Sequence, residues 1–290
     1  MSINPIVLGL VIAVVAVVIV LLNRKDKDPA EYDYQATKPP RQDKIRFGYY
    51  LGVSSQFDQV VGHTNLWWTE DGGREGAAAR LANIVRAHGA GMDVVLDVSD
   101  ALWDKTTLKP EAETNLRGLL SSIRFSGALS SIKVIVIRDE INLSYLDVCG
   151  STPEAVALCR KLIAEFNMDC MMGAIYTSSR PFCHLELFDV VGFDDYREKA
   201  NVLRPNNMYD NMRKRLRPDQ KTILLPGGYL NQSPVPWANF ANDNPEVWAI
   251  VPFLWQWPSA SEQQPGDSCI RDLPVRAEYE ALGRKLSGKE

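Results

Sequence analysis

The sequence has little of what metal centres and disulfide-rich domains need. Of its 290 residues, only three are histidine and five are cysteine, and both types are scattered without a CxxC spacing. We therefore expect no metal centre and no zinc ribbon. An odd number of cysteines without framework spacing also predicts mostly reduced, buried thiols rather than disulfides. The five are Cys149, Cys159, Cys170, Cys183 and Cys269.

Glycine-rich phosphate loops are missing as well. Gly72-Gly73 and Gly227-Gly228 fit neither GxGxxG nor GxxxxGK followed by Ser or Thr, and no GxSxG elbow occurs. The net charge of −4 and pI near 5.6, without blocks of like charge, provide no electrostatic footprint for nucleic acid. The sequence therefore predicts no nucleotide cofactor and no nucleic-acid partner.

The N-terminal region contains one long apolar run, Ile6–Leu22, with no charged or polar side chain. As a helix its 17 residues would be about 25 Å long, near the lower limit for crossing a bilayer. A buried core helix and a cleaved signal peptide are the alternatives. Since no Lys or Arg precedes the run and no clear small-x-small cleavage site follows it, we expect an uncleaved transmembrane anchor in contact with the lipid bilayer.

Three basic residues, Arg24, Lys25 and Lys27, directly follow this run, and none precedes it. The positive-inside rule then predicts a single-pass membrane protein whose globular part lies on the cytoplasmic side. Prolines and charges between residues 24 and 44 oppose a continuous helix. We expect three parts: an anchor at 1–23, a stalk at 24–44, and one domain at 45–290.

Short strand-like runs alternate with helical patterns through the third part. Helical spacing is clear at 73–88, 111–125 and 152–166, whereas the connections after the first, fifth and seventh runs are shorter. Such alternation predicts an α/β fold, and eight units predict a (β/α)8 TIM barrel; a doubly wound open sheet is the alternative. The predicted strands are 45–52, 64–68, 93–98, 132–138, 170–176, 189–194, 222–225 and 247–254.

Acidic and aromatic residues follow these strands, where a TIM barrel places its active site. Aromatic faces suit sugar rings, and paired carboxyl groups can cleave a glycosidic bond. The candidates, in strand order, are Tyr49, Tyr50, Trp67, Trp68, Glu70, Asp97, Asp139, Glu140, Tyr176, Asp194, Asp195, Tyr196, Tyr229, Trp255 and Trp257.

Three segments, 134–142, 222–229 and 249–257, resemble the TIM-barrel glycoside hydrolases. In the large clan of retaining enzymes, an Asn-Glu pair ends strand four, the Glu is the acid/base, and an aromatic residue ends strand eight. The resemblance implies that Glu140 is the general acid/base and that Trp255 is the aromatic platform. It also implies sugar-binding roles for the other aromatic strand-end residues and for Asp97 and Asp139.

The sequence departs from that clan at two positions. Asp139 replaces the Asn, and an adjacent anion would raise the pKa of Glu140. The seventh strand ends in Pro226-Gly227-Gly228-Tyr229, where the clan carries its nucleophilic Glu. Asp194 or Asp195 after strand six could replace this carboxylate, as in chitinase-like barrels, although the DxxDxDxE signature of those barrels does not fit. Strand alternation lets only one member of each acidic pair face the barrel axis.

The sequence therefore predicts a membrane-anchored, glycoside hydrolase-like barrel that acts on or binds a glycan. Glu140 would be its general acid/base, and Asp195 or Asp194 would be its second carboxylate. The alternative is a catalytically inactive glycan-binding, structural or assembly protein of a membrane, including a minor membrane protein of a virion.

Overall fold

The computed structural model describes residues 44–69, 75–142, 148–177, 182–194, 207–257 and 268–290. The chain divides into two compact units, Met1–Asp33 and Tyr34–Glu290, and the described residues all belong to the second. Among them, no helix is both long and apolar enough to cross a bilayer. The predicted anchor, Ile6–Leu22, lies outside the described residues.

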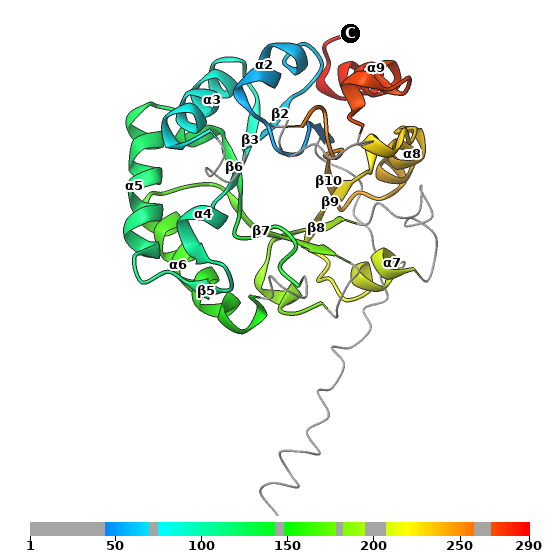
Figure 1. The fold of residues 1–290 in the computed structure, drawn as a ribbon. Helices are drawn as coiled ribbons and strands as arrows, with labels where there is room; N and C mark the ends of the chain where they lie inside the picture. The colour runs from blue at the N-terminus through cyan, green and yellow to red at the C-terminus, as the bar shows by residue number, and fades with distance from the viewer. Residues whose placement is uncertain (1–43, 70–74, 143–147, 178–181, 195–206, 258–267) are drawn as a thin grey trace, which may run out of the picture. The chain divides into compact units, whose positions relative to one another are not determined.

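The second unit is a barrel of eight parallel strands surrounded by helices (Figure 1). The order of hydrogen-bonded strands is β1-β10-β9-β8-β7-β6-β3-β2. This order follows the chain without the reversal of a doubly wound sheet, so the TIM-barrel prediction is confirmed. The strands are β1 (Arg46–Phe47), β2 (Leu66–Trp68), β3 (Asp93–Asp97), β6 (Ile132–Val136), β7 (Met171–Thr177), β8 (Val190–Asp194), β9 (Lys221–Leu225) and β10 (Val247–Ile250).

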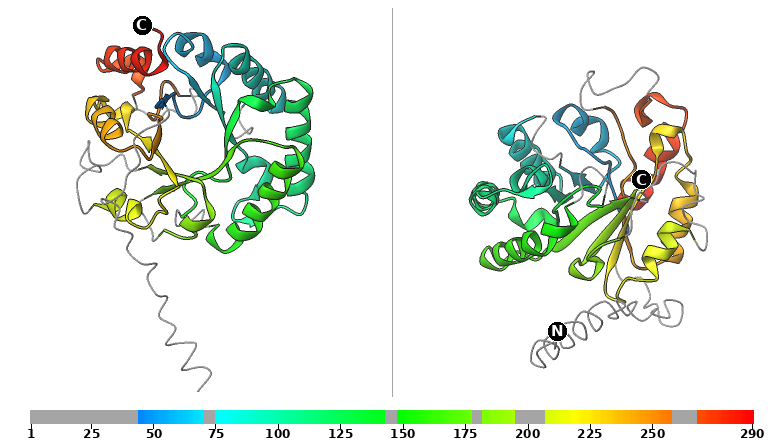
Figure 2. Two further views of the ribbon diagram at one scale, coloured as in Figure 1. Left: turned by 180° about the vertical axis from the view of Figure 1, so that it is seen from behind. Right: turned by 60° about the horizontal axis from the view of Figure 1, so that its bottom comes forward.

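Helices form the outer layer around this ring (Figure 2). The helices predicted from spacing are present as α3 (Ala77–Gly89), α5 (Ala112–Phe125) and α6 (Thr152–Glu165), and a small hairpin joins β4 (Trp103–Asp104) to β5 (Thr107–Leu108). The other α-helices are α2 (Ser54–Val60), α4 (Ser99–Leu102), α7 (Met208–Arg213), α8 (Val235–Asp243) and α9 (Arg276–Ser287). The 3-10 turns are η1 (Leu129–Ser131), η2 (Cys149–Ser151), η3 (Leu185–Leu187), η5 (Gly228–Leu230) and η6 (Ile270–Asp272).

The barrel closes at a seam between β1 and β2. The Asn65 amide donates to the Phe47 carbonyl over 3.0 Å, and the Gly52 amide donates to the Trp68 carbonyl over 2.8 Å. Gly48 permits this approach, because a Cβ atom there would lie 2.3 Å from the Leu66 carbonyl oxygen. The first strand is shorter than predicted because its regular pairing ends at Phe47, although single hydrogen bonds to the β10 side continue as far as Tyr50.

The buried side chains form two separate cores, one on each face of the sheet. The inner core fills the barrel and includes Leu66, Val95, Val134, Val136 and Ile175. The outer core lies between strands and helices and contains the alternate strand residues, among them Val94, Leu96, Ile135 and Ile137. The side-chain alternation of each strand therefore shows which strand-end residues face the barrel interior.

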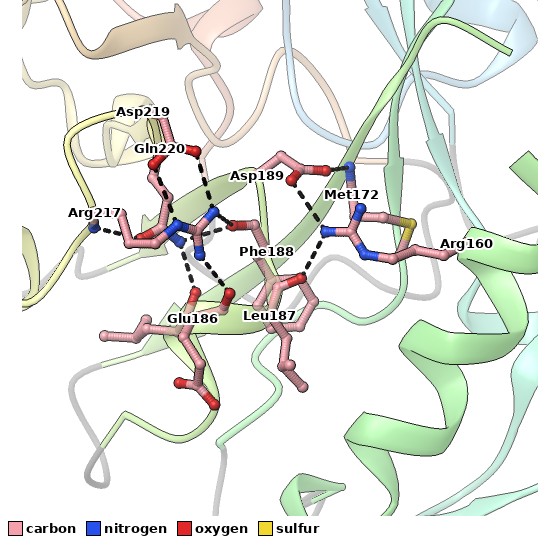
Figure 3. A network of polar contacts seen from close by, with 10 residues as sticks. Arg160, Met172, Glu186, Leu187, Phe188, Asp189, Arg217, Asp219 and Gln220 are labelled. Atoms are coloured by element: carbon pink, nitrogen blue, oxygen red, sulfur yellow. Dashed lines mark hydrogen bonds and ion pairs between the residues drawn. The ribbon is translucent and has the colours of Figure 1, made fainter. Parts of the chain in front are cut away.

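Polar contacts stabilise the N-terminal ends of strands β7, β8 and β9 (Figure 3). The Asp189 carboxylate, directly before β8, accepts from the Met172 amide and from Arg160, over 2.8 and 3.0 Å. Buried Gln220, directly before β9, donates to the carbonyls of Leu185 and Phe188. This end of a TIM barrel serves stability, and the opposite end carries the site.

One expectation from the cysteines is wrong. Cys149 and Cys183 form a disulfide, which joins the segment after β6 to the segment after β7. Cys159, Cys170 and Cys269 are free thiols. The bonded pair is 34 residues apart in sequence, and only the parallel packing of β6 and β7 brings the two segments together. The spacing of the cysteines along the sequence therefore did not predict this disulfide.

Candidate functional site

The fourth barrel strand, β6, ends in a bulge that carries Asp139 and Glu140. The Ile175 amide donates to the Arg138 carbonyl, and the Ile175 carbonyl accepts from the Ile141 amide, over 3.2 and 2.9 Å. A regular parallel ladder would use residue 140 for the second bond, so the chain contains one extra residue here. Glu140 adopts the left-handed conformation, with φ of 47°. The expected strand alternation therefore does not apply to this pair.

The bulge brings Asp139 into contact with Tyr50, which follows β1. The Tyr50 hydroxyl donates a hydrogen bond to the Asp139 carboxylate, and the Glu140 backbone amide donates a second one. Asp139 Oδ1 is buried and has no hydrogen-bond partner among the residues that the structure describes. The pair is thus held at the inner side of the barrel, against the inner-core residue Tyr50.

Both carboxyl groups have raised pKa values. Burial raises the pKa of Asp139 to about 7, with a further contribution from the charge of Glu140, while the Tyr50 hydrogen bond and Arg138 oppose the shift. Burial also raises the pKa of Glu140 above its ordinary value. The Asp139 carboxyl can therefore carry a proton near neutral pH, and the upward shift of the Glu140 pKa favours the protonated form that a general acid needs.

Aromatic side chains surround this inner end of the barrel. Tyr50 contacts Trp68 and Phe253, with ring centroids 4.9 and 5.7 Å apart. Phe253 also contacts Tyr229 and Trp257, at 5.6 and 6.0 Å. We call these five residues the mouth aromatics. Phe253 was not among the sequence candidates, although alternation from the inner-core residues Ala249 and Val251 points to it.

Two further carboxylates lie on the inner face, at the ends of strands β3 and β8. Asp97 ends β3, in alternation with inner-core Val95, and its Oδ1 accepts from the amide and hydroxyl of Ser99, over 2.9 and 2.6 Å. Asp194 ends β8 in alternation with inner-core Val190 and is 6% exposed. Asp195 and Tyr196, which were predicted beside it, lie outside the described residues, as does Glu70.

Four candidate aromatics lie in the outer core instead: Tyr49, Trp67, Tyr176 and Trp255. Trp67 packs on Phe57, at 5.1 Å between centroids. Tyr176 packs on Phe182 and Phe188, and its hydroxyl donates to the Cys183 carbonyl. Trp255 is fully buried against Tyr49 and His63, and its Nε1 donates to Gln59 Oε1 over 3.0 Å.

The positions of the eighth-strand aromatics follow from where β10 ends. Its regular pairing stops at Ile250, so strand alternation does not continue as far as Trp255. Phe253 and Trp257, not Trp255, join the mouth aromatics at this strand. The seventh strand, β9, is followed by Pro226, Gly227, Gly228 and Tyr229, and this segment holds no carboxylate.

Within the described part of the chain, no group of three or more His, Cys, Asp or Glu side chains could hold a metal ion. Asp139 and Glu140 offer two neighbouring carboxyl groups for acid–base chemistry.

No family model and no curated protein matches the chain. Its structural neighbours are glycoside hydrolases. A β-1,3-glucanosyltransferase of Rhizomucor miehei has 11% identity and a TM-score of 0.55, covering 74% of this chain and 88% of that one. A GH113 β-1,4-mannanase has 11% identity and a TM-score of 0.53, covering 83% and 99%.

A β-glucuronidase of Ruminococcus gnavus has 12% identity and a TM-score of 0.55, covering 84% of this chain and 49% of that one. The chain thus spans about half the length of this neighbour. At such identities the likeness shows the fold, which is that of a glycoside hydrolase-like TIM barrel without a single assigned family.

Proposed function

We propose that the barrel hydrolyses a glycan at the mouth aromatics, with Glu140 as the general acid. The observation that carries this proposal is the bulge at the end of β6, which sets two carboxyl groups with raised pKa values beside aromatic rings. Bulges are frequent next to active sites, where they redirect side chains. The fold of the structural neighbours supports the same reading.

In this proposal Glu140 donates a proton to the glycosidic oxygen as the bond to the sugar carbon breaks. Asp194 or Asp195 acts as the second carboxylate, and Asp194 has the inward position that this role needs. Strands β6 and β8 are separated by β7, so their axes lie about 10 Å apart. The separation of the two carboxyl groups would decide the stereochemistry: about 5 Å predicts retention, and about 6.5 to 9.5 Å predicts inversion, because inversion leaves room for a water molecule.

The substitution Glu140→Gln tests this proposal. Purified full-length chain in detergent is incubated with β-1,4-mannan, β-1,3-glucan and a β-glucuronide, the classes suggested by the neighbours, and released sugar is measured. Loss of the acid should lower the rate about 10²- to 10⁴-fold, with unchanged thermal unfolding. The matched control is Asp169→Asn, an exposed carboxyl before β7. Equal rates in the wild type and Glu140→Gln would contradict the proposal.

The alternative function is glycan binding without hydrolysis. It is favoured by the end of β9, where residues 226–229 offer no carboxylate. Isothermal titration with the same oligosaccharides separates the two functions, since binding without released sugar supports the alternative. Trp257→Ala should then weaken binding, because Trp257 is a partly exposed member of the mouth aromatics.

We further propose that Ile6–Leu22 anchors the barrel in a bilayer. The basic flank favours the cytoplasmic side, whereas the Cys149–Cys183 disulfide is typical of an oxidising compartment and favours the opposite side. From the disulfide we infer that the barrel lies on the side opposite the cytoplasm. Protease added to intact membranes should then digest the barrel without detergent, and protection of the barrel would support the cytoplasmic side.

A further inference from the structure

Asp139 and Glu140 are neighbours in a bulge, and this geometry couples their protonation. Adjacent carboxyl groups in a partly buried site resist the loss of both protons, because the second negative charge is repelled by the first. The charge of Glu140 is indeed one cause of the raised pKa of Asp139. The two groups must therefore be treated as one unit that loses its protons in two steps.

Asp139 and Glu140 have different surroundings within this unit. The Asp139 carboxylate accepts hydrogen bonds from the Tyr50 hydroxyl and the Glu140 backbone amide, and within the described part of the chain its Oδ1 is buried without a partner. An ionised carboxylate oxygen in that position would be poorly solvated, so a proton on the Asp139 carboxyl relieves the cost. Glu140 adopts the left-handed conformation in the bulge, and burial is the cause that raises the pKa of its carboxyl.

We propose that Asp139 is a positioning residue that stores the proton delivered by Glu140. This inference rests on the proposed hydrolysis. One proton is shared by the pair: it passes from the Asp139 carboxyl to the Glu140 carboxylate, and Glu140 then donates it to the leaving glycosidic oxygen. The water that attacks the sugar carbon loses its proton to the second carboxylate, so charge and atoms balance.

The groups that act on Asp139 define what can change its protonation. Glu140 and Arg138 act from its own segment, and Tyr50 acts from the segment after β1. Asp97, at the end of the neighbouring strand β3, also faces the barrel interior, but its Oδ1 already accepts hydrogen bonds from Ser99. Among the described residues, Tyr50 and Glu140 are thus the two whose removal should alter Asp139 most directly.

Carboxyl titration by ¹³C NMR tests the proposal without any substrate. The wild type should show one carboxyl that titrates near neutral pH. This titration should vanish in Asp139→Asn, move to lower pH in Glu140→Gln, and move to higher pH in Tyr50→Phe, by about one unit or more in the last two cases. Asp169→Asn, the control, should leave it in place. A wild type with no carboxyl titrating near neutrality, or a midpoint that Glu140→Gln leaves unmoved, would overturn the coupling.

The pH dependence of hydrolysis supplies the second readout. In Asp139→Asn, Glu140 loses its proton at lower pH, so the alkaline limb of kcat should move toward acid by about one unit or more, with activity recovered at low pH. A uniform loss of kcat at every pH would contradict a proton-storing role. If the titrations behave as expected but no glycan is cleaved, the coupling stands and the proposed hydrolysis fails.

Discussion

At the scale of single residues, Asp139 should make the stability of the barrel depend on pH. Its pKa is about 7 in the folded chain and about 3.9 when unfolded, so the folded state holds more protons between these values. The free energy of unfolding should therefore fall as pH rises from about 4 to about 7. Urea unfolding across this range measures the slope, which should be smaller in Asp139→Asn. An equal slope in both proteins would count against a raised pKa.

A glycine at the barrel seam offers a second prediction at this scale. In Gly48→Ala the new Cβ would lie 2.3 Å from the Leu66 carbonyl oxygen, a backbone atom that cannot rotate away. The substitution should cost about 1–3 kcal/mol of unfolding free energy, measured by urea denaturation. Gly62→Ala is the control, because a Cβ there meets nothing within 4 Å and Gly62 has no left-handed φ. Similar losses in both variants would show that the seam is not the cause.

At the scale of elements, the buried contacts at the N-terminal ends of β8 and β9 should contribute more to stability than the exposed residues beside them. Gln220→Ala leaves the buried carbonyls of Leu185 and Phe188 without the Gln220 donor, which should cost about 1–3 kcal/mol. Asp219→Asn, next to it but 74% exposed, should change the stability by less than about 0.5 kcal/mol. Thermal or urea unfolding of the two variants makes the comparison.

Elements were the level at which the sequence was most informative. Period-two and helical patterns located eight strands and three helices, because core burial imposes those periods on the sequence. They misplaced single side chains where pairing becomes irregular. The bulge at Glu140 and the early end of β10 are examples, since both depend on hydrogen bonds between distant segments. Trp255 was misplaced for this reason, whereas Phe253 follows the alternation of Ala249 and Val251 and was overlooked.

At the scale of the whole molecule, the Cys149–Cys183 bond should contribute to stability. It closes a loop of 34 residues, and the loss of chain entropy in the unfolded state corresponds to about 3–4 kcal/mol. Cys149→Ser and Cys183→Ser should therefore unfold at lower temperature than the wild type. A reducing agent should lower the unfolding temperature of the wild type but not that of either variant. Scanning calorimetry with and without dithiothreitol measures both effects. A wild type indifferent to reduction would contradict this expectation.

The barrel seam has a consequence for the order in which the chain is made. The C-terminal helix α9 packs against the seam: Gly283 lies against the His63 carbonyl and Phe47, and Lys289 donates to the carbonyls of Val61 and Thr64. The first strand thus depends on residues that are synthesised more than 200 positions after it. Until β10 and α9 have left the ribosome, β1 lacks its strand partner and its helical cover, so the nascent barrel stays open and exposes apolar strand edges. Chaperones that bind such edges should associate with the chain until α9 emerges.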